Sequence, residues 1–228
     1  MKALPGKFSA PSAAIAQFLD VVSLPSASFA RITEGSVKVT WLVAALSMFF
    51  VLFEGAALLH NSAALSTAEM GVGSNLSRVV NIIVVLSIAT IPVILLLRII
   101  SCAFLLWIGT MLTDLGVNFK QLMSLCASIE IITALHEVTL ATLKLALHLS
   151  PISHADVGLN LLIPAHGILE SLLGLFNPFT IWYVALTVLG LKWIGRSTTS
   201  RAVLSALPLL IASVVFTVGM ATLTKAHL

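Results

Sequence analysis

The segment VVNIIVVLSIATIPVILLLRIISCAFLLWIGTML, residues 79–112, contains a single charged residue, Arg98. An apolar run of this length predicts a membrane-spanning helix, because about 20 apolar residues are enough to cross a bilayer. As a straight helix the run would measure about 50 Å, which exceeds the hydrocarbon thickness of about 30 Å. We therefore expect this helix to tilt, to project from the bilayer or to kink at Pro92, whose ring removes a backbone donor.

The composition of the whole chain agrees with this segment. Of the 228 residues, 59% are apolar and only 9% are charged, whereas soluble domains carry about 25% charged residues. The mean hydropathy is +1.10, so we predict a one-domain, all-α integral membrane protein that contacts the lipid bilayer. The net charge of +3 comes from basic residues that form no patch, which argues against nucleic acid as a partner.

Apolar runs divide the chain into five predicted spans. The spans cover about residues 41–60, 79–112, 119–149, 177–195 and 199–223. Residues 1–40 are predicted to form a cytoplasmic arm with an amphipathic helix on the membrane surface, since apolar residues recur there at helical spacing. These apolar residues are Ala14, Ile15, Phe18, Leu19 and Val22. Residues 150–176 are interrupted by Pro164 and Gly167 and predict an interfacial or re-entrant segment, so the fold class is a five-transmembrane-helix bundle in residues 41–228.

The basic residues predict how the bundle is oriented, because Lys and Arg concentrate on the cytoplasmic side of membrane proteins. With the N-terminus inside, the inner segments hold Lys2, Lys7, Arg31, Lys38, Lys120, Lys192, Arg196 and Arg201. The outer segments hold only Arg78 and Lys225. This bias predicts a multi-pass protein of the cell membrane with a cytoplasmic N-terminus and an external C-terminus.

Ionisable residues are concentrated in the third predicted span, in IEIITALHEVTLATLKLALH, residues 129–148. Glu130, Glu137 and Lys144 follow one another at intervals of seven, and His148 follows Lys144 by four. These four side chains share one face of a helix, whereas His136 points about 100° away. Because a charge at mid-bilayer costs about 2.5–3.5 kcal/mol, this face is expected to meet partners on other spans.

Two acid–base pairings follow from the expected depths of these residues. We expect Arg98 to pair with Glu137 or Glu130, and Glu54 to pair with Lys144. With His148 these residues form a predicted polar seam, which comprises Glu54, Arg98, Glu130, Glu137, Lys144 and His148.

Three hypotheses account for the polar seam. The preferred one is a salt-bridge network that fixes helix register, and the second is an ion or proton relay. The third is a metal site in which His136, His148, His166 or Glu170 joins the glutamates of the seam. The chain contains no HExxH, GxSxG, P-loop or GxGxxG pattern. We therefore predict no catalytic residue and no cofactor, and we interpret Cys102 and Cys126 as core residues.

Three stretches of the chain resemble the Yip family of membrane proteins. FLDVVSLPSASFARITEG (residues 18–35) resembles the segment that leads into the family's first span, with its Pro-Xaa-Xaa-Xaa-Phe turn. TDLGVNFKQLMSLCAS (residues 113–128) resembles the link between the second and third spans, although it carries one Gly where many members have two. NPFTIWYVALTVLGLKWIGRSTTSRAVLSALPLLI (residues 177–211) resembles the fourth and fifth spans.

The resemblance implies a five-helix membrane domain with a cytoplasmic N-terminus. Eukaryotic members interact with Rab-type GTPases, but this chain has no long cytosolic arm and is similar to a bacterial-type member of the inner membrane, so Rab binding is not expected. The expected function is a non-enzymatic scaffold that binds membrane proteins or lipids, or that self-associates. The alternative is a small transporter or ion-handling protein that uses the polar seam, and an intramembrane enzyme comes third.

Overall fold

A computed structural model describes residues 10–68, 74–146, 157–163 and 167–226, and in these residues all regular structure is helical. The helices are α1 (Ala10–Ser23), α2 (Pro25–Thr33), α3 (Val39–Ala68), α4 (Ser74–Leu112), α5 (Phe119–Ile129), α6 (Ile131–Ala146), the short 3₁₀ helix η1 (Leu159–Leu161), α7 (Ile168–Leu175), α8 (Pro178–Ile194) and α9 (Thr199–Ala226).

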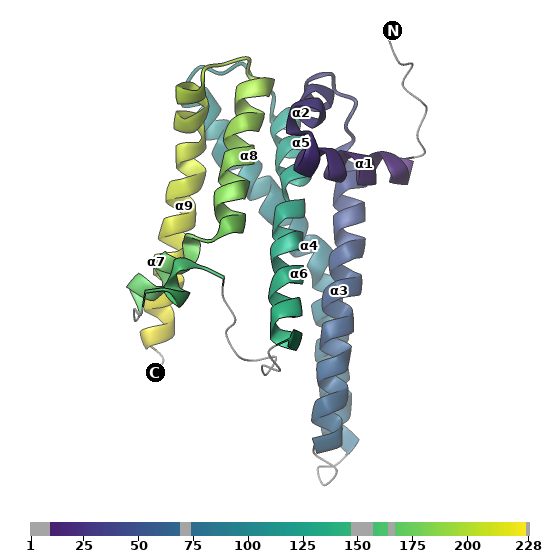
Figure 1. Cartoon of the computed structure of the whole chain (residues 1–228). Helices are drawn as coiled ribbons and strands as arrows, with labels where there is room; N and C mark the ends of the chain where they lie inside the picture. Colours follow the sequence, from purple (N-terminus) through teal and green to yellow (C-terminus); the bar gives the residue numbers. More distant parts are fainter. Residues whose placement is uncertain (1–9, 69–73, 147–156, 164–166, 227–228) are drawn as a thin grey trace.

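The long helices pack side by side and alternate in direction (Figure 1). α3 and α4 form an elongated hairpin, α5 and α6 follow each other nearly end to end, and α4 crosses the bundle diagonally to reach α9. α1 lies across the long helices, and α2 packs beside α8 and α5. α7 lies at the opposite end of the bundle against α9.

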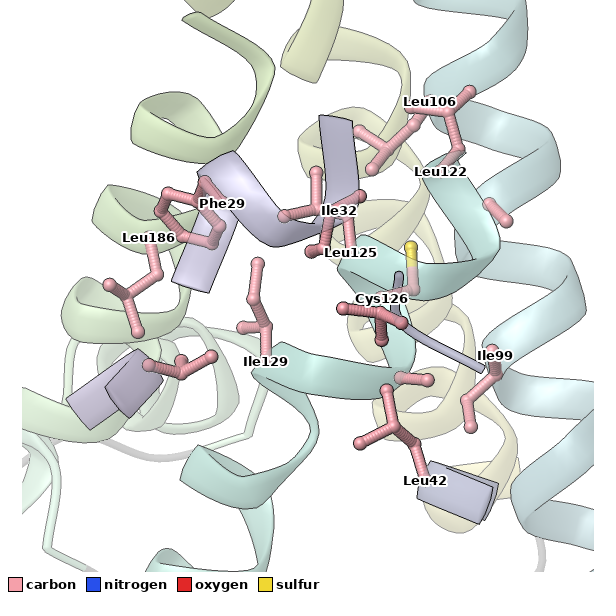
Figure 2. Close-up of a cluster of buried hydrophobic side chains, with 14 of the residues drawn as sticks. Phe29, Ile32, Leu42, Ile99, Leu106, Leu122, Leu125, Cys126, Ile129 and Leu186 are labelled. Carbon is pink, nitrogen blue, oxygen red and sulfur yellow. The ribbon is translucent and has the colours of Figure 1, made fainter. Parts of the chain in front are cut away.

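The hydrophobic core lies at the end of the bundle where α5 begins, and the N-terminal helices are part of it. Phe29 and Ile32 of α2 are fully buried and lie beside Leu125 of α5 and Leu186 of α8 (Figure 2). The segment that we predicted as a cytoplasmic arm therefore packs as a helical hairpin, α1–α2, into the same core as the long helices.

The outer surfaces of α4 and α9 are apolar, as expected for helices that contact lipid. Val93 and Leu97 of α4, and Val215 and Phe216 of α9, are all more than half exposed. Water-soluble proteins rarely expose contiguous apolar surface of this kind. The helices of this chain are therefore compatible with a membrane protein.

Three helical stretches in the described residues are long and apolar enough to cross a bilayer: Ala89–Leu112, Phe119–Lys144 and Thr199–Leu223. A fourth is present if α7 and α8, which are bent by 55° at their junction, form one broken span. The apolar part of α3 within the residues searched, Val39–Phe53, is shorter. The last of the three long stretches coincides with a predicted span.

The third predicted span differs from the expected single helix, because Glu130 separates α5 from α6. The backbone hydrogen bonds nevertheless continue across the break. The Glu130 amide donates to the Cys126 carbonyl at 3.1 Å, and the Ala134 amide donates to the Glu130 carbonyl at 3.2 Å. The break is a local distortion of one span, so the polar face that we predicted for a regular helix begins at an irregular residue.

The ends of α3 and α4 differ from those of the predicted spans, whereas α8 agrees with the prediction. α3 extends beyond the predicted 41–60 at both ends, and Pro92 lies inside α4, which is one helix from Ser74 to Leu112. α8 begins and ends as the sequence indicates. The Thr180 amide donates to the Asn177 side-chain oxygen at 2.7 Å, and the helix stops before Gly195.

Candidate functional site

A polar contact between long helices joins Arg98 of α4 to the junction of α5 and α6. Nε of Arg98 lies 3.1 Å from Oε1 of Glu130, and Nη2 of Arg98 donates to Oγ1 of Thr133 at 3.0 Å. Of the two partners that the sequence offered for Arg98, the structure pairs it with Glu130.

The two charges of this pair differ in burial. The side chain of Glu130 is 1% exposed, whereas that of Arg98 is 48% exposed. Oε1 of Glu130 accepts no hydrogen bond in the part of the chain that the structure describes, so its main stabilisation is the adjacent positive charge. A buried carboxylate without such a charge would lose several kcal/mol of solvation, and Arg98 offsets part of that cost for Glu130.

Local sequence explains why Arg98 can serve both the interior and the surface. Leu95 and Ile99 point into the core, and Ile94 and Leu97 are exposed. Arg98 is thus placed at the edge between the buried and the exposed faces of α4. From that edge its long side chain reaches Glu130 while part of it stays exposed at the outer surface.

Cys102 and Tyr183 lie beside the ion pair. Cys102 follows Arg98 by one helical turn on α4, and the hydroxyl of Tyr183 on α8 donates to its sulfur at 3.8 Å. Cys126 is buried in α5, and its carbonyl accepts a hydrogen bond from the Glu130 amide at 3.1 Å. The sequence predicted Cys102 and Cys126 as core residues; the structure buries Cys126, leaves Cys102 half-buried, and places both beside the pair of Arg98 and Glu130.

Glu137 and Lys144, the other members of the polar seam whose side chains the structure describes, are not seen in this contact. Glu137 is half-buried and has neither an ion pair nor a hydrogen bond in the described part of the chain. Lys144 is also half-buried and has an interaction with another group. The side chain of Glu54 and residue His148 lie outside the described residues, so the predicted pairing of Glu54 with Lys144 stays a prediction.

Of the candidate metal ligands, the structure describes His136 and Glu170, which lie on different helices. His136 packs against Phe179 of α8 with ring centroids 5.1 Å apart, and its buried Nε2 has no hydrogen-bond partner in the described residues. Glu170 is exposed on α7, and His166 lies outside the described residues. In the residues that were searched, no three side chains of the types that bind metals come together.

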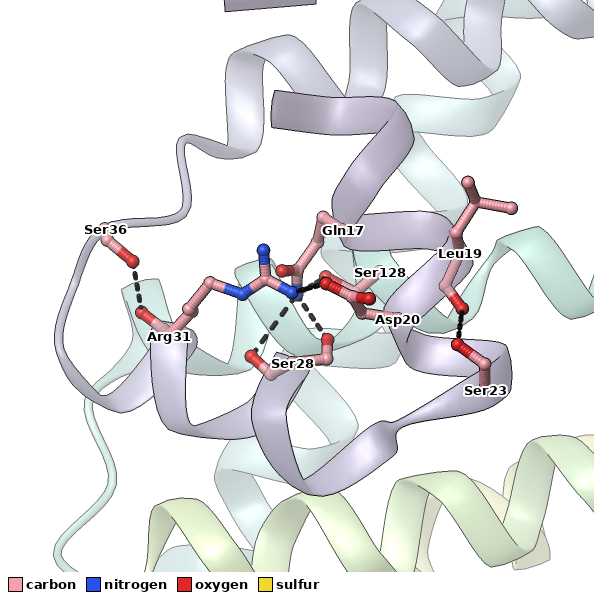
Figure 3. Close-up of polar contacts among 8 residues, drawn as sticks. All are labelled: Gln17, Leu19, Asp20, Ser23, Ser28, Arg31, Ser36 and Ser128. Atoms are coloured by element: carbon pink, nitrogen blue, oxygen red, sulfur yellow. Dashed lines mark hydrogen bonds and ion pairs between the residues drawn. The ribbon is translucent and has the colours of Figure 1, made fainter. Parts of the chain in front are cut away.

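A second polar cluster, which the sequence did not indicate, fastens the α1–α2 hairpin to α5 (Figure 3). The side-chain nitrogen Nε2 of Gln17 donates to the hydroxyl of Ser28 at 2.6 Å and to the hydroxyl of Ser128 at 3.3 Å. All three side chains are buried. Arg31 and Asp20 form an ion pair that also joins α2 to α1. The cluster orients the hairpin, because buried polar groups must find their partners in one arrangement.

Neither a protein-family model, nor a curated protein, nor a solved structure matches this chain.

Proposed function

We propose that the protein is a non-enzymatic scaffold of the cell membrane, with five spans and a cytoplasmic N-terminus, of the type that the Yip family represents. The five spans would be α3, α4, α5 with α6, α8 and α9. The eight basic residues assigned to the inner segments and the alternating helix directions support this topology (Figure 1). The proposed role is to bind other membrane proteins, lipids or a second copy of itself.

The observation that carries the proposal is the filled interior at the end of the bundle where α5 begins. Phe29, Ile32 and Val21 of the α1–α2 hairpin are at most 1% exposed, and Leu122 and Leu125 of α5 are fully buried against them. A transporter needs an aqueous route to this end, and tightly packed apolar side chains exclude water. The packing therefore favours a protein that acts through its outer surface.

The topology can be tested with single cysteines in a chain that lacks Cys102 and Cys126. Ser36→Cys, Gly116→Cys and Ser197→Cys should react with a membrane-impermeant maleimide only from the cytoplasmic side. Ser74→Cys should react only from the outer side. Labelling of Gly116→Cys and Ser197→Cys from opposite sides would contradict the proposed five-span arrangement, because the two residues flank α5–α8 and must then be separated by an odd number of crossings.

Ion or proton handling is the second candidate, and Glu137 favours it. This half-buried carboxylate lies two turns beyond Glu130 along the same span and has no partner in the described residues. We expect reconstituted vesicles to show no proton or cation flux above protein-free vesicles, and Glu137→Gln to leave partner binding unchanged. A flux that Glu137→Gln abolishes would replace the scaffold proposal with a transporter.

A further inference from the structure

Arg98 exposes nearly half of its side chain on a mostly apolar surface of α4. A guanidinium group has five N–H donors; one Nη2–H binds Thr133, and Nε lies 3.1 Å from Oε1 of Glu130. The other donors have no partner in the described residues, and the side chain is 48% exposed. In a bilayer, unpaired N–H groups at such a surface are costly, so a molecule that supplies oxygen acceptors should cover them.

The surroundings of Arg98 indicate an amphiphile with an apolar tail. Ile94 and Leu97, which precede Arg98 toward the α3–α4 turn, are 60% and 58% exposed. Acyl chains lying along these two side chains would bring a headgroup to Arg98. Planar guanidinium groups bind phosphate oxygens with two parallel hydrogen bonds, and they do so more specifically than an ammonium group.

The α1 helix sets the depth of this site. Gln17 of α1 binds Ser128 in the last turn of α5, and Glu130 follows Ser128 by about 3 Å along the helix axis. Ile15 and Leu19 of α1 are 58% and 64% exposed, and α1 lies across the bundle (Figure 1). A helix with this orientation and these exposed side chains fits the membrane interface. With α1 there, the end of α4 beyond Arg98 would project past the hydrocarbon of the bilayer, and Arg98 would lie within snorkelling reach of the inner headgroups.

We propose that Arg98 binds the phosphate of an anionic phospholipid of the inner leaflet at the lipid-facing surface of α4. Glu130 fixes the guanidinium group from behind, and Ile94 and Leu97 contact the acyl chains. The inference rests on the membrane placement proposed above and adds a ligand class to it. A phosphate ligand also accounts for the position of Arg98 at the edge of α4, where part of its side chain is exposed.

The test measures lipid retention by the full chain in mild detergent. Dioleoyl phosphatidylglycerol and dioleoyl phosphatidylcholine, which share their acyl chains, are supplied at equal concentration and counted by native mass spectrometry. We expect wild-type protein to prefer the anionic lipid by roughly tenfold or more, the range of a charge-assisted hydrogen-bonded contact. Phosphatidylglycerol should raise the Tm of the protein, and phosphatidylcholine should not. Inorganic phosphate should neither raise the Tm nor displace the bound lipid.

The variants separate Arg98 from general basicity. Arg98→Gln should remove the preference, Arg98→Lys should retain part of it, and Arg201→Gln, at the exposed start of α9, should leave it unchanged. Because Arg98→Gln leaves Glu130 buried without its partner, the double variant Arg98→Gln/Glu130→Gln provides a version without an unpaired charge.

Several results would overturn the proposal. The first is equal retention of both lipids by wild-type protein, and the second is an unchanged lipid preference in the folded double variant. The third is binding of inorganic phosphate as tight as that of phosphatidylglycerol. The fourth is a dimer that Arg98→Gln dissociates without loss of bound lipid, which would place Arg98 in a protein interface. The first and third need no variant and decide the question even if the variants fail to fold. The cysteine-labelling pattern is independent of all four results, so a failed lipid site and a failed topology are distinguishable.

Discussion

Gly109 marks the closest approach between α4 and α9, and replacing it with alanine tests the packing of these two candidate spans. A Cβ atom at this position would collide with the carbonyl oxygen of Ser205, and it would lie 2.7 Å from the carbonyl carbon and 3.0 Å from Cα. The obstacle is backbone, so no side chain can rotate away. Thr113, one turn further along α4, binds Ser205 through hydroxyl groups 2.5 Å apart, and this contact holds the same crossing together.

The expected cost of Gly109→Ala follows from this geometry. Overpacking a core costs about 1–3 kcal/mol, and a clash with backbone belongs at the upper end because the helices themselves must separate. For a chain of this size each kcal/mol lowers Tm by about 2–4 °C, so we expect a decrease of about 6–12 °C. The assay is thermal unfolding in mild detergent, followed by the fluorescence of the four tryptophans.

Gly116→Ala is the matched control. A Cβ atom at Gly116 would have no atom within 4 Å, and the residue is exposed. The control should melt within about 2 °C of wild-type protein, since surface substitutions usually change stability by no more than 0.5 kcal/mol. If Gly109→Ala melts at the same temperature as this control, α4 and α9 do not approach as closely as described and the packing argument is wrong.

Three further substitutions can be measured by the same unfolding assay. Gln17→Ala should cost about 1–3 kcal/mol, because it leaves the buried hydroxyl of Ser128 without this donor; an unchanged Tm would show that the polar cluster does not hold the hairpin. Asn177→Ala should cost about 1 kcal/mol by removing the N-cap of α8. A loss of stability no larger than that of a surface substitution would contradict the cap. Phe29→Ala should cost about 3–5 kcal/mol because the side chain is fully buried, whereas Leu24→Ala, at a 59% exposed position, should be nearly neutral; equal losses at the two positions would argue that α2 does not enter the core.

The apolar runs and helix ends could be predicted from the sequence because they depend on local composition. The stretch from Thr199 to Leu223 is apolar throughout, and both the predicted and the observed spans cover it. Asn177 and Gly195 have strong preferences for helix ends, and α8 lies between them. The interruption at Glu130 has no such signal, because the surrounding residues include neither Pro nor Gly.

The polar contacts could be predicted only in part because they depend on how helices cross. The spacing of seven residues placed Glu130 and Glu137 on one face, but it could not decide between them as partners of Arg98. The diagonal path of α4 makes that choice, since α4 packs against α5 and brings Arg98 to Glu130 (Figure 1). Gln17 and Ser128 are 111 residues apart, and residues of these types are common, so their hydrogen bond left no recognisable pattern in the sequence.

The union of the α1–α2 hairpin with α5 also has a consequence for biosynthesis. The hairpin is translated first, yet its partner Ser128 follows Gln17 by 111 residues. At about 5–20 residues per second, the ribosome needs roughly 6–22 seconds to supply that partner. During this interval the nascent hairpin must keep Phe29 and Ile32 away from water without its final neighbours. The membrane surface beside the translocon is the nearest apolar environment, so the N-terminus should dock on lipid before it docks on protein.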